Sequence, residues 1–375
     1  MERDNERAWI AGKAAPLDAA VAAAAKLLAA SRQPLIAGLG TDVAGARAAL
    51  ALARQTGAVV DHMASAALLR DVEAMRTAGL MLTTPGETQL GADTLLLVGP
   101  GLAQAWPELP QKLFGKIRPA DGNADVERRV FWLAPGRDSA TLTAAGTSLT
   151  TIGKEPRDLP ILLAALRARI ADRPAGKMRV AAATLDELAA RLKSACFGVA
   201  VWSAASLDAL TIEMLCGLVS DLNASTRFSS LPLAPADNAM GVLQTCGWTS
   251  GFAPRIGFGR GFAEHDPWLF DSRRLVASGE TDCVVWISAY RGQAPSWRET
   301  PPTIALTGQN AVFGPAPRVQ IQVGHPGVDH ACVQHSTSTG TLVALEASAP
   351  SGIVSVADAI ARIAAALPGH GEHPC

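Results

Sequence analysis

The sequence has few cysteines, and their spacing excludes two kinds of metal site. The six are Cys196, Cys216, Cys246, Cys283, Cys332 and Cys375, and none precedes residue 196. No two of them are separated by only two residues, so neither a zinc knuckle nor an iron–sulfur run is expected. Scattered cysteines are typical of proteins in reducing compartments, and we therefore expect a cytoplasmic protein.

An excess of charge of either sign is also missing. Lysine and arginine total 33 and aspartate and glutamate total 34, which gives a formal net charge of −1. A nearly neutral chain offers no obvious basic surface for nucleic acid or an anionic membrane. The sequence also lacks an apolar signal core near its start and an unbroken apolar stretch of membrane-spanning length. We expect no nucleic-acid partner and no membrane partner.

The chain does have the composition of a folded protein with a large core. Of its 375 residues, 49% are hydrophobic and 18% are charged, which disfavours disorder. This length allows two or three domains of ordinary size. Apolar runs alternate with helical patterns along most of the chain, and this alternation predicts an α/β fold with parallel, Rossmann-like sheets.

Residues 33–69 form the stretch from which the rest of the interpretation follows. A short apolar run, Leu35 to Ala37, ends at Gly38 and Gly40 and predicts a buried strand. Thr41 or Asp42 can cap a following helix, which Gly57 ends. Residues 58–60 predict the next strand, and the loop leaving a parallel strand at its carboxyl end is where ligands usually bind. We therefore expect any chemistry at residues 61–69, and a helix from Arg70 to Gly79.

This order of proline, strand, glycine turn, alanine-rich helix and Gly57-Ala58-Val59-Val60-Asp61 resembles the catalytic B subunits of formylmethanofuran dehydrogenases, members of the molybdopterin oxidoreductase superfamily. In that family the next loop carries a cysteine or selenocysteine ligand to tungsten or molybdenum, followed by His-Gly-Pro. The ligand position falls here on Ala67, whose methyl group cannot bind a soft metal. Leu68, Leu69 and Arg70 take the other three positions. The family's cysteine-rich cluster segment has no counterpart either.

A second block carries the resemblance further. It contains an asparagine, glycines, a glutamine, a tryptophan and an Arg-Gly pair at spacings that match those subunits: Asn238, Gly241, Gln244, Thr245, Trp248, Gly251, Arg260 and Gly261. The favoured interpretation is an irregular loop held by glycine with tryptophan in a core. An aromatic, glycine-rich surface would serve a subunit interface equally well. Altogether the resemblance covers roughly residues 9–366.

The resemblance implies a discontinuous architecture. Residues 1–66 and 178–366 would form one Rossmann-like domain, residues 67–177 an inserted α/β domain, and residues 367–375 a flexible tail. A vestigial pterin cleft would then include Ala67, Leu68, Leu69, Asn238, Gln244, Trp248 and Arg260, with Leu68 and Leu69 turned inward. No catalytic residue, confident cofactor ligand or metal ligand is expected.

Because it lacks the metal ligand but keeps the matched block, the chain resembles the B subunits of formyltransferase/hydrolase complexes of aerobic methylotrophs. Such complexes transfer a formyl group from tetrahydromethanopterin to methanofuran and hydrolyse formylmethanofuran to formate. The resemblance implies a non-redox, structural subunit. Its partners would be the A subunit, which is a zinc-dependent hydrolase, the C subunit, and the D subunit, which is a formyltransferase. Contact between methanofuran and this chain stays open.

Other function classes rest on weaker patterns. An active molybdopterin dehydrogenase with an unusual ligand is one alternative. An NAD(P)-binding dehydrogenase is another, but Gly38, Gly40 and Gly45 do not have the dinucleotide-binding spacing. His325, His330 and His335 recur every five residues, which does not place them on one face. Ser206, His265 and Asp266 lack the nucleophile elbow of hydrolases.

Overall fold

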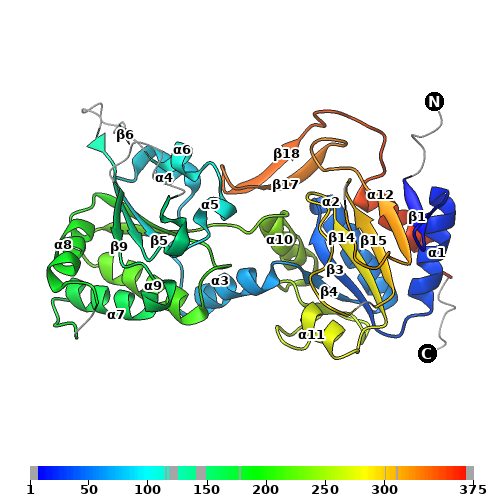
Figure 1. Cartoon of the computed structure of the whole chain (residues 1–375), viewed down its shortest axis with the longest axis horizontal. Coiled ribbons are helices and arrows are strands. Elements are labelled where there is room, and N and C mark those ends of the chain that lie inside the picture. The colour runs from blue at the N-terminus through cyan, green and yellow to red at the C-terminus, as the bar shows by residue number, and fades with distance from the viewer. Residues whose placement is uncertain are drawn as a thin grey trace. The chain divides into compact units, whose positions relative to one another are not determined.

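The computed structural model describes residues 7–114, 116–117, 126–140, 149–176, 179–299, 301–309 and 311–368. These residues form two compact units. The first contains residues 7–65, 236–335 and 342–368, and the second contains residues 66–235 and 336–341 (Figure 1). Both units are α/β, as the alternating pattern predicted.

The first unit is built on a nine-stranded sheet in the order β13-β12-β4-β3-β14-β15-β16-β1-β2. Apolar runs such as Leu35–Ala37 form its centre because a parallel strand is buried on both faces. The parallel strands are β3 (Pro34–Gly40), β4 (Val59–His62), β14 (Cys283–Ser288), β15 (Thr303–Thr307) and β16 (Val319–Gln322). Antiparallel edges are added by β1 (Ala8–Ile10), β2 (Lys13–Ala14), β12 (Ile256–Gly257) and β13 (Glu264–His265).

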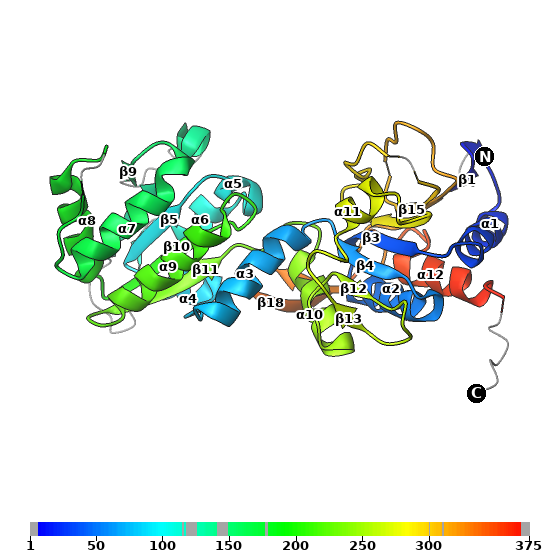
Figure 2. The ribbon, with the colours of Figure 1, turned by 90° about the horizontal axis from the view of Figure 1, so that it is seen from below.

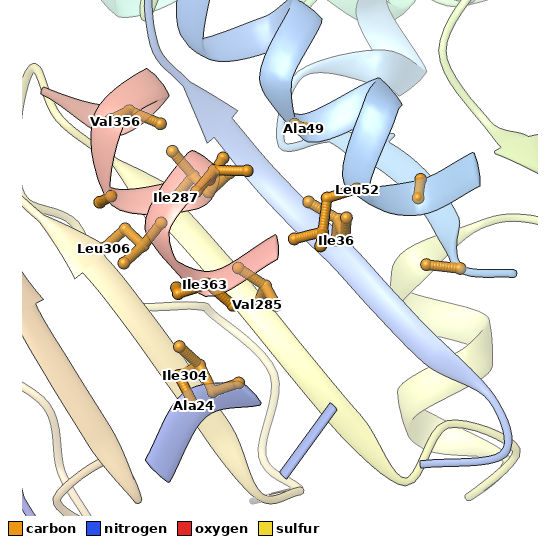
Figure 3. Packing of buried hydrophobic residues seen from close by; sticks show 14 of the residues in the cluster. Ala24, Ile36, Ala49, Leu52, Val285, Ile287, Ile304, Leu306, Val356 and Ile363 are labelled. Atoms are coloured by element: carbon orange, nitrogen blue, oxygen red, sulfur yellow. The ribbon is translucent and has the colours of Figure 1, made fainter. Parts of the chain in front are cut away.

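Different elements cover the two faces of this sheet. One face packs against α1 (Leu17–Ala29), α2 (Val43–Thr56), α10 (Ala239–Ser250) and α12 (Val356–Ala365). Figure 3 shows Leu52 of α2 and Ile363 of α12 against Ile36 and Val285 of the strands. The opposite face carries α11 (Ser272–Ala277), as Figure 2 shows. The loop residues Trp297 and Phe313 also pack against this face. Asp42, one of the two predicted capping residues, accepts a hydrogen bond from the amide of Gly45 (2.9 Å).

The second unit has a fully parallel sheet in the order β11-β10-β5-β8-β9. Its strands are β5 (Thr94–Val98), β8 (Arg129–Leu133), β9 (Leu149–Ile152), β10 (Phe197–Trp202) and β11 (Arg227–Pro232). Its helices are α3 (Ser65–Thr77), α4 (Pro85–Gly91), α5 (Leu102–Ala105), α6 (Leu109–Leu113), α7 (Leu159–Ile170), α8 (Ala182–Lys193) and α9 (Ala209–Leu222). Small elements complete the chain: the hairpins β6 (Lys116–Ile117)–β7 (Val126–Glu127) and β17 (Cys332–Ser336)–β18 (Thr341–Leu345), and the 3-10 turns Gly136–Ala140 and Pro156–Asp158.

One predicted domain boundary needs correction. The first change of unit follows Ser65, one residue from the predicted position, but the return follows Pro235 and not residue 177. Strand β10 pairs with β5 on one side and with β11 on the other, so residues 179–235 complete the second sheet. The predicted linker, residues 171–177, is described to residue 176 and joins α7 to α8 within that unit. The predicted tail is described only to residue 368.

None of the helices in the described ranges is long and apolar enough to cross a membrane.

Candidate functional site

The loop predicted to carry the chemistry is replaced by a helix. Helix α3 begins at Ser65, whereas the sequence interpretation placed a loop to residue 69 and the helix start at Arg70. Residues 65–70 read Ser-Ala-Ala-Leu-Leu-Arg, in which alanine, leucine and arginine are strong helix formers and no glycine or proline interrupts. The Ser65 hydroxyl also accepts a hydrogen bond from the amide of His62 (3.0 Å). Without Gly and Pro, the helix starts close to the end of β4.

The position that the resemblance predicts for the metal ligand lies inside this helix. Ala67 is 6% exposed and belongs to the apolar core of the second unit. Leu68 is 2% exposed, whereas Leu69 is only half-buried. The prediction that both leucines turn inward is therefore right for Leu68 and only partly right for Leu69, because neighbouring helical positions point about 100° apart.

The next two residues fasten α3 to the end of strand β10. Arg70 donates to the carbonyl of Ala204 (2.8 Å), and the indole of Trp202 donates to Asp71 (3.0 Å). Burial raises the pKa of the Asp71 carboxyl to about 6, opposed by the Trp202 hydrogen bond and by Arg70. Arg70, which the resemblance places at the family's proline position, is therefore a cation that fixes the helix.

The carboxyl edge of the first sheet contains the usual ligand position of such folds. Strands β3 and β14 are neighbours, and the chain proceeds from them in opposite directions, to β4 and to β15. Crevices at such switch points bind ligands in open α/β sheets. Here Asp237, 6% exposed, forms an ion pair with Arg291, whose Nε lies 2.9 Å from Oδ2. The Asp237–Arg291 ion pair therefore lies at the edge where a ligand would be expected.

Asn238 is tied at both ends of its side chain in the same region. Its amide donates to the carbonyl of Thr41 (2.8 Å) and accepts from the amide of His335 (2.8 Å). Asp237 and Asn238 both have left-handed backbone angles, with φ of 59° and 57°, a conformation that Asp and Asn tolerate better than most residues. Asn238, a predicted cleft residue, thus bridges β3 to β17.

His62, at the end of β4, is 1% exposed and uses both ring nitrogens. Nδ1 accepts from the amide of Ala64 (2.9 Å), and Nε2 lies 3.3 Å from the carbonyl of Asp237. This pattern fits the neutral tautomer with its proton on Nε2. Burial lowers the pKa of His62 to about 4, with smaller opposing effects from Asp237. The imidazole therefore acts as a neutral structural link.

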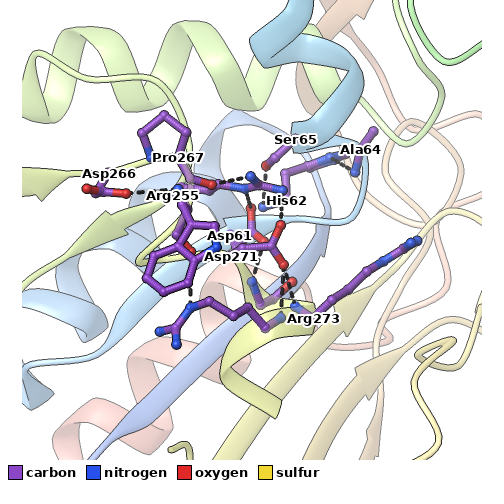
Figure 4. A network of polar contacts seen from close by, with 12 residues as sticks. Asp61, His62, Ala64, Ser65, Arg255, Asp266, Pro267, Asp271 and Arg273 are labelled. Carbon is purple, nitrogen blue, oxygen red and sulfur yellow. Dashed lines mark hydrogen bonds and ion pairs between the residues drawn. The ribbon is translucent and has the colours of Figure 1, made fainter. Parts of the chain in front are cut away.

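Asp61 holds the segment after α10 in place (Figure 4). It is 2% exposed, accepts from the amide of Ser272 (2.9 Å) and lies 3.6 Å from Nε of Arg255. Arg255 also pairs with Asp271 and donates to the carbonyl of Pro267. Burial raises the pKa of the Asp61 carboxyl, while its hydrogen bonds to Ser272 and Ser65 and the charge of Arg255 oppose the shift.

The remaining predicted cleft residues lie on the surface of the first unit. Residues 239–250 form α10, not the expected irregular loop, and its Trp248 is 54% exposed, not in a core. The Trp248 indole donates to the carbonyl of Gln244, which is itself exposed (2.7 Å). Arg260 is 73% exposed at its side chain and pairs with Glu264 (2.9 Å). That these residues descend from one cleft stays a prediction.

The weaker sequence candidates find structural explanations. A Cβ on Gly38 would lie 2.5 Å from the carbonyl oxygen of Ile287, so this glycine permits close approach of β3 and β14. His265 stacks on Phe252 and contacts the carbonyl of Arg255, whereas Ser206 belongs to the second unit. Within the described ranges, no three His, Cys, Asp or Glu side chains gather as a metal site would require.

The sequence interpretation missed Asp237, Arg291 and Arg255. Arg291 follows an apolar strand and Asp237 precedes a helix, which are positions where ligand-binding groups often occur. The pairs they form join residues far apart in the chain, so no local spacing could have indicated them.

Comparison with known proteins gives relatives over nearly the full length. No established family model matches the chain. The B subunit of the formyltransferase/hydrolase complex of Methylorubrum extorquens is 36% identical over 345 residues, 92% of each chain. The B subunit of the tungsten-containing formylmethanofuran dehydrogenase 2 of Methanocaldococcus jannaschii is 26% identical over 73% of this chain and 64% of its own length.

A solved structure of the same complex also matches the chain. The crystal structure of the formyltransferase/hydrolase complex of Methylorubrum extorquens with methylofuran contains a chain that superposes with a TM-score of 0.84. That chain is 36% identical, and the match covers 96% of this chain and 98% of the other.

The two leucines of α3 give a matched test of which side of the helix faces the core. We expect Leu68→Ala to lower the free energy of unfolding by about 2–5 kcal/mol, because it empties a buried volume. Leu69→Ala should cost roughly half as much or less, since Leu69 is half-buried and both substitutions keep a good helix former. Denaturant unfolding measures both, and equal costs would contradict the assigned helix orientation.

His62 should make stability depend on pH. Its folded-state pKa of about 4 lies below the ordinary value of 6.5, so the unfolded chain takes up the proton first. Stability should therefore fall as pH drops from about 6.5 to 4, by roughly 3 kcal/mol at most.

His62→Asn is the control, because an asparagine oxygen can still accept from the Ala64 amide but does not titrate in this range. The difference in unfolding free energy between wild type and variant should shrink as pH falls. Asp71 titrates with the opposite sign in both proteins and cancels in this difference. A difference that stays constant from pH 7 to 4 would refute a buried neutral imidazole.

Proposed function

The chain belongs to the family of B subunits of formyltransferase/hydrolase complexes, and we propose that it is the non-redox, structural subunit of such a complex. The complex would transfer a formyl group from formyl-tetrahydromethanopterin to methanofuran and hydrolyse formylmethanofuran to formate. The reactions would occur in the sister hydrolase, which would hold zinc, and in the sister formyltransferase. This chain would hold these two together with the C subunit. A cytoplasmic location is part of the same proposal.

One observation carries the non-redox assignment. The resemblance places the family's metal-ligand position at Ala67, which lies in a continuous helix with its methyl group in an apolar core. The family has a sulfur or selenium donor to tungsten or molybdenum at this position, and alanine has no donor atom. A helix in place of a loop also removes the free backbone that would approach a pterin. We therefore propose that this chain binds neither a tungsten or molybdenum pterin nor an iron–sulfur cluster.

The edge of the first sheet supports the same proposal. Asp237, Arg291, Asn238 and His62 satisfy one another or nearby backbone groups where a ligand would be expected. A ligand would have to displace Arg291 from the buried carboxylate of Asp237, and leaving a buried carboxylate unpaired is costly. This also counts against an NAD(P)-binding dehydrogenase.

We further propose that both sheets are Rossmann-like and descend from the molybdopterin oxidoreductase fold. In chain order the second sheet reads 5-4-1-2-3, which is one direction of the doubly wound order 3-2-1-4-5. The parallel strands of the first sheet read 2-1-3-4-5, the other common doubly wound order.

Reconstitution tests the proposal. The chain is co-expressed with the sister hydrolase, formyltransferase and C subunits, purified through a tag on the hydrolase, and analysed by mass spectrometry, activity assay and elemental analysis. We expect stoichiometric recovery of this chain, loss of assembly and of formyl transfer when it is omitted, and no tungsten, molybdenum or cluster iron bound to it. Ala67→Cys should assemble equally and still take up neither metal.

Two results would count against the proposal. Tungsten or molybdenum held by this chain would favour an active dehydrogenase. Full assembly and activity without the chain would remove the structural role. A thermal-shift series with NAD and NADP covers the remaining alternative, for which stabilisation by either dinucleotide is the signature.

A further inference from the structure

Exposed aromatic side chains are concentrated in one short segment of the first unit. Trp248, Phe252, Phe262 and Trp268 are 54%, 39%, 55% and 70% exposed, and Leu269 beside them is 42% exposed. The other tryptophan and phenylalanine side chains in the described part of the chain are buried or half-buried. We call these five side chains the aromatic surface. Exposed large apolar groups gathered on one segment are a feature of interaction sites.

The aromatic surface is held in position by bonds within the chain. The Asp266 carboxylate accepts from the amides of Trp268 (2.8 Å) and Leu269 (2.7 Å). Arg274 places its guanidinium 4.6 Å from the Trp268 ring centre and donates to the carbonyl of Leu269 (2.7 Å). These groups are therefore ordered before any partner arrives, which lowers the entropy cost of binding.

Arg255 links the part of the surface around Phe252 to the part around Trp268. Its carbonyl contacts the ring of His265, which stacks on Phe252 with ring centres 6.0 Å apart. Its guanidinium binds the carbonyl of Pro267, next to Trp268, and pairs with buried Asp61 and with Asp271. A buried ion-pair network therefore attaches the surface to the sheet. A partner would bind to a segment that is already fixed in position.

The charges around the surface indicate the chemistry of its partner. Arg273 is exposed, and no carboxylate pairs with it among the described residues. Arg260 lies 5.6 Å from the Phe262 ring, and its ion pair with Glu264 is too exposed to be strong. Two arginines can therefore form ion pairs with carboxylates of a partner. Tryptophan, phenylalanine and arginine are also the residues that dominate the energy of protein–protein contacts.

Other occupants fit these groups less well. The cavities of about 290 and 750 Å³ lie elsewhere, at residues 294–318 and 134–180, so the surface is not part of either ligand-sized hollow. Asp266 is fully exposed, binds the amides of Trp268 and Leu269, and adds a negative charge to the surface. We propose that the aromatic surface is the docking site for a sister subunit of the complex that presents apolar pockets bordered by carboxylates. This inference rests on the proposed function.

The test uses the co-expressed complex with a tag on this chain. Trp268→Ala combined with Phe262→Ala should weaken the association of this chain with a sister subunit, by about 30-fold or more, the effect of losing contacts that dominate an interface. Leu90→Ala and Leu210→Ala, exposed leucines of the second unit, are the matched controls and should leave association unchanged. Arg273→Glu should weaken association and Arg273→Lys should largely restore it, which separates charge pairing from general disruption.

The outcomes separate this inference from the proposed function. If wild type fails to associate with any sister subunit, the proposed function fails. If wild type associates and the double variant binds equally well, the docking site is wrong. Should the double variant lower the unfolding midpoint of the free chain, Trp268→Ala alone decides, because its ring is 70% exposed.

Two further measurements address the other occupants. Flotation with phosphatidylglycerol–phosphatidylcholine vesicles that depends on Trp268 would assign the surface to a membrane and overturn the proposal. Sedimentation that shows a wild-type dimer lost in the double variant would assign it to a second copy of this chain and overturn it equally.

Discussion

The burial of Asp61 at the end of β4 requires a cation, and Arg255 supplies it from nearly two hundred residues further along the chain. An unpaired carboxylate at this depth would cost several kcal/mol, so the strand end and the segment around Arg255 must come together as the unit folds. The same guanidinium fixes Pro267 and Asp271. A structural charge in the sheet therefore determines the position of a surface loop that would otherwise have little core of its own.

The proposed loss of redox chemistry would be a change of backbone as much as of side chains. Where the resemblance to the dehydrogenases predicts a ligand-carrying loop, this chain has a helix that starts at Ser65, shortly after β4 ends. Alanine and leucine favour that helix locally, and Arg70 and Asp71 attach it to Ala204 and Trp202. Local propensity and tertiary contact agree, which is the condition for a single stable conformation.

Much of the fold could be predicted from the sequence, because buried parallel strands are unbroken apolar runs such as Leu35–Ala37 and the helices between them have clear periodicity. Two predictions were wrong, the start of α3 and the return of the chain to the first unit. In both, a pattern shared with the family or repeated along the chain was given more weight than local evidence. The start of α3 is predicted too late when the family's loop is given more weight than the helix propensity of residues 65–69. The return to the first unit is predicted too early because β10 begins another strand–helix repeat, and such repeats look the same in either sheet.

The site was harder to predict than the fold. Pairs such as Asp237 with Arg291 and Asp61 with Arg255 depend on tertiary contacts that leave no local spacing. Trp248 was expected in a core because tryptophan usually contributes to one, yet its indole bonds to Gln244 one turn back and its ring faces water. The residues of the matched block can be identified from sequence alone, but the side of the unit on which they lie cannot.

The ties around Asn238 have an evolutionary consequence. Its amide joins Thr41 to His335, while neighbouring Asp237 holds Arg291 and, through its carbonyl, His62. Removing one of these groups would leave a buried partner such as the Asp237 carboxylate unpaired, so opening this edge would cost stability. Such interdependence makes single substitutions unfavourable here, so this edge could be remodelled only by several substitutions made together.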